Sequence, residues 1–422
     1  MSDTTNLEGI DGNPLVFGDL EWNLGIYLGL IGLTFLEYGT VRKANGNHLL
    51  VKNILQFAVA FVAWWLIGYA FALGDVDSKF IGQEHFGGEN WLFDTGDGSP
   101  SYFGLIGIFV LYIINGAISE KAHYIAYPVF TFWIMVVIWP IVVAWMWGPG
   151  GWLQTELETS VDDFGFTITI YVFAGAFSMV GAALTGRRAG RYYSHSRAPA
   201  FIMEHHSFYY IGALLLIIGI FTLNNDLRAG ENYLSAGAFA NTWICGAASS
   251  IIALKLLTIF SVDLCSHFTA VYQGFIAGMV LISSSANCNA WEAGLFGMMA
   301  GLVFALGVKF LKWLQFDDVL NIVPTFFFPG LIGGVLPGFI DNESGVFWGG
   351  TDGNLLAVKV VAVVVVCAWA TFWAIVIFGL LRAFGLLTLN DEIQTAGLDN
   401  TIFTQKGFEL IKQENIVVDN QE

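Results

Sequence analysis

The chain has 422 residues, of which 56% are hydrophobic and 12% are charged, and its mean hydropathy is +0.65. A soluble domain carries about 25% charged residues, so a soluble enzyme and a disordered chain are both poor interpretations. The net charge of −17 disfavours a nucleic-acid binder, because there is no basic surface to neutralise phosphates. What remains is a polytopic membrane protein.

The apolar stretches predict transmembrane helices, because a helix needs about 20 apolar residues to cross the roughly 30 Å hydrocarbon core. We expect eleven of them. In chain order they are Leu24–Tyr38, Ile54–Leu73, Tyr102–Ser119, Tyr124–Trp147, Thr167–Thr185, Ser207–Leu223, Leu234–Phe260, Phe268–Ser283, Ala290–Leu311, Val319–Ile340 and Leu355–Leu381. The predicted fold is therefore an all-α polytopic membrane protein, with a transmembrane domain over residues 1–385 and a short cytoplasmic tail over 386–422.

The distribution of basic residues predicts the orientation, since cytoplasmic loops are rich in Lys and Arg. With the N-terminus outside, all the basic residues fall on the cytoplasmic side except Lys79, Arg228 and Lys359. The opposite orientation would reverse this bias. We therefore expect the N-terminus outside and the C-terminus in the cytoplasm, most simply in the plasma membrane. An organellar membrane stays open as an alternative.

Two segments share a short pattern that indicates an internal repeat. Each begins with an aspartate, continues with an aromatic residue eight positions later and ends with a glycine four positions after that. The two sets are Asp163, Tyr171 and Gly175 in the fifth predicted helix, and Asp318, Phe326 and Gly330 in the tenth. Units with an odd number of helices insert with opposite polarity, which is the inverted repeat common in transporters. The expected architecture is two inverted five-helix repeats plus one extra helix.

Residues suited to metal or acid–base chemistry are sparse. The four cysteines show no CxxC spacing, and each histidine falls in a loop or at the end of a predicted helix. The pair His205 and His206 lies at the predicted cytoplasmic mouth of the sixth helix, where a solvated interfacial pair is the simplest interpretation and a gate or metal site is the alternative. We expect no metal, no cofactor and no enzymatic activity.

The sequence resembles the ammonium transporter/Rhesus family over nearly its whole length. The resemblance depends on the order and spacing of several short motifs, none of them specific alone. They are Gly116-Ala-Ile-Ser-Glu120, Trp147-Gly148-Pro-Gly150-Gly151, Asp163-Phe164, Gly186-Arg187-Arg188, Asp317-Asp318 and Gly397-Leu398-Asp399. It implies a homotrimer in the lipid bilayer, in which each protomer carries a pore for ammonium or ammonia between its two halves.

The resemblance also assigns pore positions. Trp147 matches the tryptophan of the family's outer aromatic cage, and Asp163 matches the acid that supports this site. The two midplane histidines fall at Tyr171 and Phe326, so both are lost. The stacked phenylalanines fall at Ile106 and Leu223, and the cage hydroxyl at or near Leu227; the usual histidine of the tail is Phe403.

Each assigned residue has a simpler alternative. Asp163 suits the start of a helix, where aspartate is favoured, and Trp147 suits the membrane interface. Tyr171 and Phe326 could simply fill the core. A phenylalanine cannot form a hydrogen bond with a cation that has lost its water. A tyrosine, with a pKa near 10, is a poor proton relay at neutral pH.

These substitutions leave two hypotheses for the function. The first is an ammonium transporter-family protein whose pore is altered and weak or blocked. The second is a non-conducting sensor or a structural subunit of a larger membrane complex, which would require other membrane proteins as partners.

Overall fold

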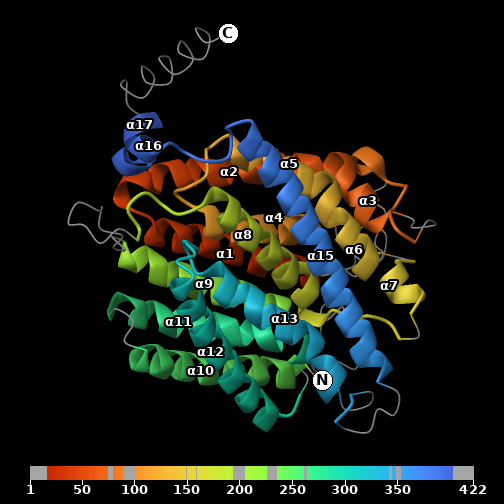
Figure 1. Cartoon of the computed structure of the whole chain (residues 1–422). Coiled ribbons are helices and arrows are strands. Elements are labelled where there is room, and N and C mark those ends of the chain that lie inside the picture. The colour runs from red at the N-terminus through yellow and green to blue at the C-terminus, as the bar shows by residue number, and fades with distance from the viewer. Residues whose placement is uncertain are drawn as a thin grey trace.

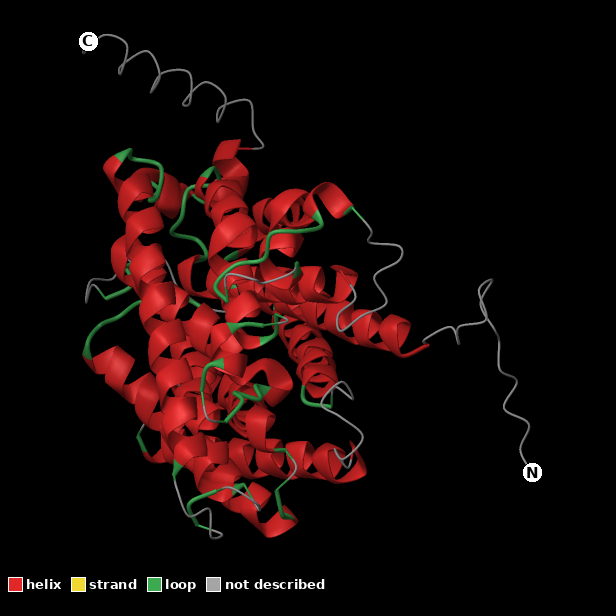
Figure 2. Ribbon diagram, turned by 90° about the vertical axis from the view of Figure 1, so that its right-hand side faces the viewer, coloured by secondary structure: helices red, strands yellow, loops and turns green. Residues whose placement is uncertain are grey.

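The computed structural model describes residues 17–74, 79–89, 100–148, 150–157, 159–192, 205–225, 235–260, 264–286, 288–341, 345–347 and 353–402. Over these ranges all regular structure is helical, with no strand (Figure 2). The predicted all-α class is therefore confirmed.

Helices cover every apolar stretch predicted from the sequence. The long α-helices are α1 (Phe17–Thr40), α2 (Gly46–Ala63), α4 (Pro100–Ile118), α8 (Phe173–Thr185), α9 (His206–Leu223), α10 (Ser235–Ile259), α11 (Leu264–Ile282), α12 (Ala290–Trp313) and α15 (Asn354–Ala383). Shorter helices are α3 (Tyr69–Leu73), α5 (Ala126–Trp133), α6 (Trp139–Met146), α7 (Trp152–Thr155), α13 (Phe328–Val335), α14 (Pro337–Ile340), α16 (Asp391–Ala396) and α17 (Leu398–Ile402).

Nine helical segments of the described chain are long and apolar enough to cross a membrane, and Thr269–Ser285 is a shorter apolar helix. This establishes an integral membrane protein with many spans. The predicted number of eleven spans and the inverted repeats stay predictions.

The second predicted helix begins earlier than expected, at Gly46 and not near Ile54. Its first turns carry polar residues that resemble a loop in the sequence. In the structure they are buried because they find partners on α1: the Lys52 Nζ lies 2.6 Å from Glu37 Oε1, and the Asn53 amide donates to Glu37 Oε2 at 3.2 Å. Hydropathy alone therefore placed this helix start too late.

The helices form two groups, α1–α6 together with α8 on one side and α9–α13 on the other, with the long α15 lying diagonally across both (Figure 1). The groups join where α1 packs along α9 at glycines. A Cβ on Gly32 would lie 2.4 Å from the backbone nitrogen of Leu216, and one on Gly212 would lie 2.3 Å from that of Leu36. Small residues allow such close backbone approach between membrane helices.

Large apolar side chains on the outer faces of α10, α12 and α15 are exposed, among them Ile251, Trp291, Val364 and Phe372. A soluble protein rarely exposes so much contiguous apolar surface. These faces suit contact with lipid.

Four of the long helical segments contain a π-helical turn, which is uncommon and frequently marks a functional site. These turns are η2 (Trp64–Gly68), η4 (Ile134–Ile138), η6 (Thr167–Val172) and η9 (Val323–Phe327). The η6 and η9 turns continue into α8 and α13. They contain Tyr171 and Phe326, so both midplane candidates lie in this unusual backbone.

Candidate functional site

Tyr171 and Phe326 meet in the interior between the two groups of helices. Their rings stack with centroids 5.9 Å apart and planes at 27°. Tyr171 is 0% exposed and Phe326 is 2% exposed, and the Tyr171 hydroxyl has no hydrogen-bond partner among the described residues. The two residues occupy matching positions in the shared sequence pattern, and in the structure their rings stack directly.

The segments that lead to the two rings share their local structure. Asp163 Oδ1 accepts the backbone NH of Ile168 at 2.9 Å, and Asp318 Oδ2 accepts that of Val323 at 2.7 Å. Each carboxylate therefore closes the start of a π-helical turn. Three residues after each aspartate the backbone has a positive φ, 55° at Phe166 and 54° at Asn321. The two segments therefore share local structure as well as sequence spacing.

Asp163 is buried, and both oxygens of its carboxylate accept hydrogen bonds. Besides Ile168, it accepts the backbone NH of Thr169 at 2.8 Å and the Thr169 hydroxyl at 2.7 Å. Burial raises the pKa of this carboxyl above its usual value, although these donors and the Lys359 charge act against the rise. Asp163 thus caps the helix, as its alternative interpretation predicted.

An aromatic cluster lies beside Asp163 and consists of Trp147, Phe166 and Phe103. Trp147 and Phe166 stack with centroids 4.4 Å apart, and Phe103 packs edge-on at 6.0 Å from Phe166. The indole NH of Trp147 donates to Thr169 Oγ1 at 3.1 Å, which links the cluster to Asp163. Rings in such a group present faces that attract a cation.

The structure adds two residues to the site that the sequence analysis missed, Phe103 and Phe166. Phe103 lies one helical turn before Ile106, and its aromatic side chain was the only signal that could have found it. Ile106 and Leu223 are buried, and their role as pore residues stays a prediction. Leu227 and Phe403 lie outside the described residues.

The histidine pair singled out in the sequence lies at the start of α9. His205 stacks on Tyr38 at 5.1 Å and His206 stacks on Tyr210 at 6.3 Å, at the start of α9. No group of three or more His, Cys, Asp or Glu residues suited to a metal occurs among the residues that the structure describes. The histidine pair is therefore packed against rings in the structure.

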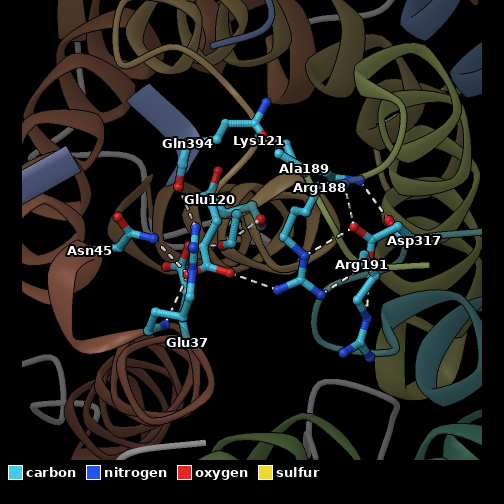
Figure 3. Close-up of polar contacts among 12 residues, drawn as sticks. Glu37, Asn45, Glu120, Lys121, Arg188, Ala189, Arg191, Asp317 and Gln394 are labelled. Atoms are coloured by element: carbon cyan, nitrogen blue, oxygen red, sulfur yellow. Dashed lines mark hydrogen bonds and ion pairs between the residues drawn. The ribbon is translucent and has the colours of Figure 1, made fainter. Parts of the chain in front are cut away.

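A second polar site lies at the opposite end of the bundle, where α16 and α17 are bound; we call this the tail end, and the other the Asp163 end. Its centre is a buried ionic triad of Glu120, Arg188 and Asp317 (Figure 3). The Arg188 guanidinium makes two hydrogen bonds of 3.0 Å to Asp317 and one of 2.7 Å to Glu120. The triad joins the ends of α4 and α8 to the loop before η9.

The pKa values of the two carboxyl groups in this triad result from two opposing effects, burial and ion pairing. Burial alone would raise the pKa of Asp317, but the charge and hydrogen bonds of Arg188, together with the Lys121 charge, outweigh burial and lower this pKa to about 2. Burial would also raise the pKa of Glu120, but the charges and hydrogen bonds of Arg188 and Arg42 together outweigh burial and lower this pKa. Burial also lowers the pKa of Lys121 to about 8, and its Nζ donates to the carbonyl of Asp317 at 2.6 Å.

The tail contributes to this second site. Arg42 bonds both Glu120 and the carbonyl of Gln394 in α16, the latter at 2.7 Å. Asp399 in α17 accepts the backbone NH groups of Asn47 and His48 at the start of α2. The described part of the tail is therefore bound to the bundle (Figure 1).

The many apolar spans of this helical bundle define a polytopic integral membrane protein. Within it, two similar segments meet at a buried ring stack. The sequence profile of the Ammonium Transporter Family matches residues 22–408. The chain belongs to this family.

Named relatives agree with this assignment. The chain is 26% identical over 410 residues to "Putative ammonium transporter 1 member 5" of Arabidopsis thaliana, covering 89% of this chain and 82% of that protein. It is 27% identical over 416 residues to "Ammonium transporter 3" of Dictyostelium discoideum, covering 91% of this chain and 92% of the relative.

Solved structures share the fold. A structure named "Sensor Amt Protein" superposes with a TM-score of 0.81 at 21% identity, covering 89% of this chain and 95% of that one. Mep2 of Saccharomyces cerevisiae superposes with a TM-score of 0.74 at 21% identity, covering 88% of each chain.

Proposed function

We propose that this protein is an ammonium transporter-family scaffold whose central pathway is narrowed by aromatic side chains, so that permeation of ammonium or ammonia is weak or blocked. The observation that carries the proposal is the Tyr171–Phe326 stack, with centroids 5.9 Å apart. A charge at the centre of a bilayer costs at least about 2.5–3.5 kcal/mol even on the lenient scale. Two rings and one hydroxyl offer little to replace the water of a cation.

The proposed architecture of the protein has eleven spans, built as two inverted five-helix repeats and one extra helix. The matched carboxylates of Asp163 and Asp318 support the repeat. The protein would insert with its N-terminus outside and its tail in the cytoplasm, most simply in the plasma membrane, and it would assemble as a homotrimer. The Asp163 end is then the outer mouth, where Trp147 and Asp163 form part of a recruitment site.

Uptake of methylammonium into liposomes that contain the purified protein tests the proposal. We expect slow uptake and no fast electrogenic current from the unmodified protein. The double variant Tyr171→His and Phe326→His restores two groups that titrate near neutral pH, and uptake should rise above that of the parent protein. The variant Tyr171→Phe is the matched control, since it keeps both rings and gains no imidazole; its uptake should stay low. Fast current from the unmodified protein would contradict a blocked pathway.

A second candidate function is a non-conducting sensor or a subunit of a larger membrane complex. The same buried stack favours it, since a fully closed pathway would leave a binding protein. A stable partner that copurifies from native membranes would support the subunit version, and a solitary trimer would argue against it.

A further inference from the structure

Lys359 is a buried basic residue at the Asp163 end of α15. It lies in the second turn of this helix and is 2% exposed. A charged side chain in an apolar membrane helix costs free energy unless a partner faces it. Such residues in membrane proteins commonly have a functional role. Neither the family motifs quoted above nor the proposed pathway uses this residue.

Its contacts place a positive charge beside the segment that carries Asp162 and Asp163. The Lys359 Nζ donates a hydrogen bond to the backbone carbonyl of Asp162. The charge of Asp163, the next residue in the chain, interacts with that of Lys359, as do the charges of Asp162 and Asp341. Asp162 and Asp341 are exposed and therefore well screened by salt, whereas Asp163 and Lys359 are both buried and screened much less. The buried pair determines the local field.

This field acts on the rings through a continuous set of contacts. Trp147 bonds the Thr169 hydroxyl, and that hydroxyl bonds the Asp163 carboxylate. An uncompensated carboxylate behind the rings would strengthen their attraction for a cation. The positive charge of Lys359 offsets the negative charge of the Asp163 carboxylate, so the rings keep only their own weak attraction for a cation.

We propose that Lys359 is a specificity-determining residue, which offsets Asp163 and makes the aromatic cluster of Trp147, Phe166 and Phe103 favour neutral ammonia over the ammonium cation. This inference rests on the proposed function, because it assumes that the Asp163 end meets ammonium or ammonia. It differs from a purely structural role for Lys359, which would change stability and leave cation affinity as it is.

Calorimetric titration of the purified full-length protein with methylammonium chloride tests this inference. The titration is made at pH 6, where the probe is a cation, at fixed ionic strength and against sodium chloride. The variant Lys359→Gln keeps a donor for the Asp162 carbonyl and removes the charge. It should bind methylammonium on the order of tenfold more tightly than the unmodified protein. The variant Lys359→Arg keeps the charge and should match the unmodified protein within about twofold.

Two further variants locate the effect. Adding Trp147→Leu to Lys359→Gln should abolish the gain, since it removes a ring of the cluster. Lys79→Gln is the matched control, because Lys79 is half-exposed and pairs with Glu156; screening should keep its effect within about twofold. If Lys359→Gln does not fold, Lys359→Met gives the same measurement with an apolar chain of similar length.

Equal affinity of Lys359→Gln and the unmodified protein would overturn the inference while the proposed function stands. A gain that survives Trp147→Leu, or one that Lys79→Gln reproduces, would overturn it as well. Absence of binding in all variants would also overturn it, and together with absent uptake in the double-histidine variant it would reject the proposed function too.

Discussion

Gly175 packs so closely against Phe327 that a β-carbon on the glycine would lie 2.4 Å from the Phe327 Cβ. The matching glycine of the other segment, Gly330, faces Tyr171, where a β-carbon would lie 3.0 Å from the Tyr171 Cβ. Each glycine lies four residues after one stacked ring and admits the segment that carries the other ring. The ring stack therefore depends on having glycine, which has no side chain, at both positions.

The substitution Gly175→Ala should destabilise the protein, because the added methyl group overlaps a buried backbone and ring. Overpacking of this kind costs typically about 1–3 kcal/mol, and Gly330→Ala should cost less because its contact is longer. The measurement is the thermal unfolding midpoint in detergent. Gly379→Ala is the matched control: Gly379 is also helical, in α15, and a β-carbon there meets nothing within 4 Å. Equal midpoints for Gly175→Ala and the unmodified protein would show that the close approach has no energetic consequence.

The shared spacing of Asp163, Tyr171 and Gly175 and of Asp318, Phe326 and Gly330 was visible in the sequence, because it consists of distances along the chain alone. The helices were visible as well, since membrane spans need long apolar stretches. The fifth predicted helix, Thr167–Thr185, agrees with η6 and α8 at both ends.

Other parts of the site depend on contacts between distant segments, which no local pattern encodes. Hydropathy could not place Phe103 against Phe166, since both are simply apolar residues within or beside a helix. It also treated the polar start of α2 as a loop, because the partner Glu37 lies on another helix. The ionic triad was hidden for the same reason: Glu120, Arg188 and Asp317 come from three separate turns.

The substitution Arg188→Met should be strongly destabilising, because it removes the guanidinium that two buried carboxylates share. Among the described residues, Glu120 keeps only Arg42 as an ion-pair partner, and Asp317 keeps only the more distant Arg191, 3.9 Å away. Removing one partner of a buried ion pair costs about 3–5 kcal/mol. Arg188→Lys should recover only part of this, since lysine cannot reproduce the two parallel hydrogen bonds to Asp317. The free energy of unfolding, measured by denaturant titration in detergent micelles, checks both expectations.

The control for the triad is the exposed ion pair of Lys79 and Glu156, whose side chains are 54% and 49% exposed. Lys79→Met should change stability by less than about 1 kcal/mol. The triple variant Glu120→Gln, Arg188→Met and Asp317→Asn should be more stable than Arg188→Met alone, because it leaves no buried carboxylate that has lost the Arg188 guanidinium. If the triple variant is no more stable, the loss in Arg188→Met has another cause than buried carboxylates without this guanidinium.

Asp318 should make stability depend on pH in the opposite sense to Asp317. Burial raises the pKa of Asp318 to about 6 from a usual value of 3.8, and Oδ1 has no hydrogen-bond partner among the described residues. Between these values the folded protein holds a proton that the unfolded chain has released. Stability therefore falls as the pH rises from about 4 to about 6, by up to about 3 kcal/mol. Asp317, with its pKa lowered to about 2, contributes stability that is lost only as the pH falls from about 4 toward 2.

The variant Asp318→Asn isolates this contribution. An asparagine oxygen can still accept the backbone NH of Val323, which lies 2.7 Å from the present carboxylate, and it does not titrate. Unfolding measured at intervals between pH 4 and pH 7 should show a decline in the unmodified protein and a smaller decline in Asp318→Asn. The two proteins should differ least near pH 4, where Asp318 is protonated in the folded state. Parallel curves over the whole range would show that Asp318 ionises in the folded protein at its ordinary pKa.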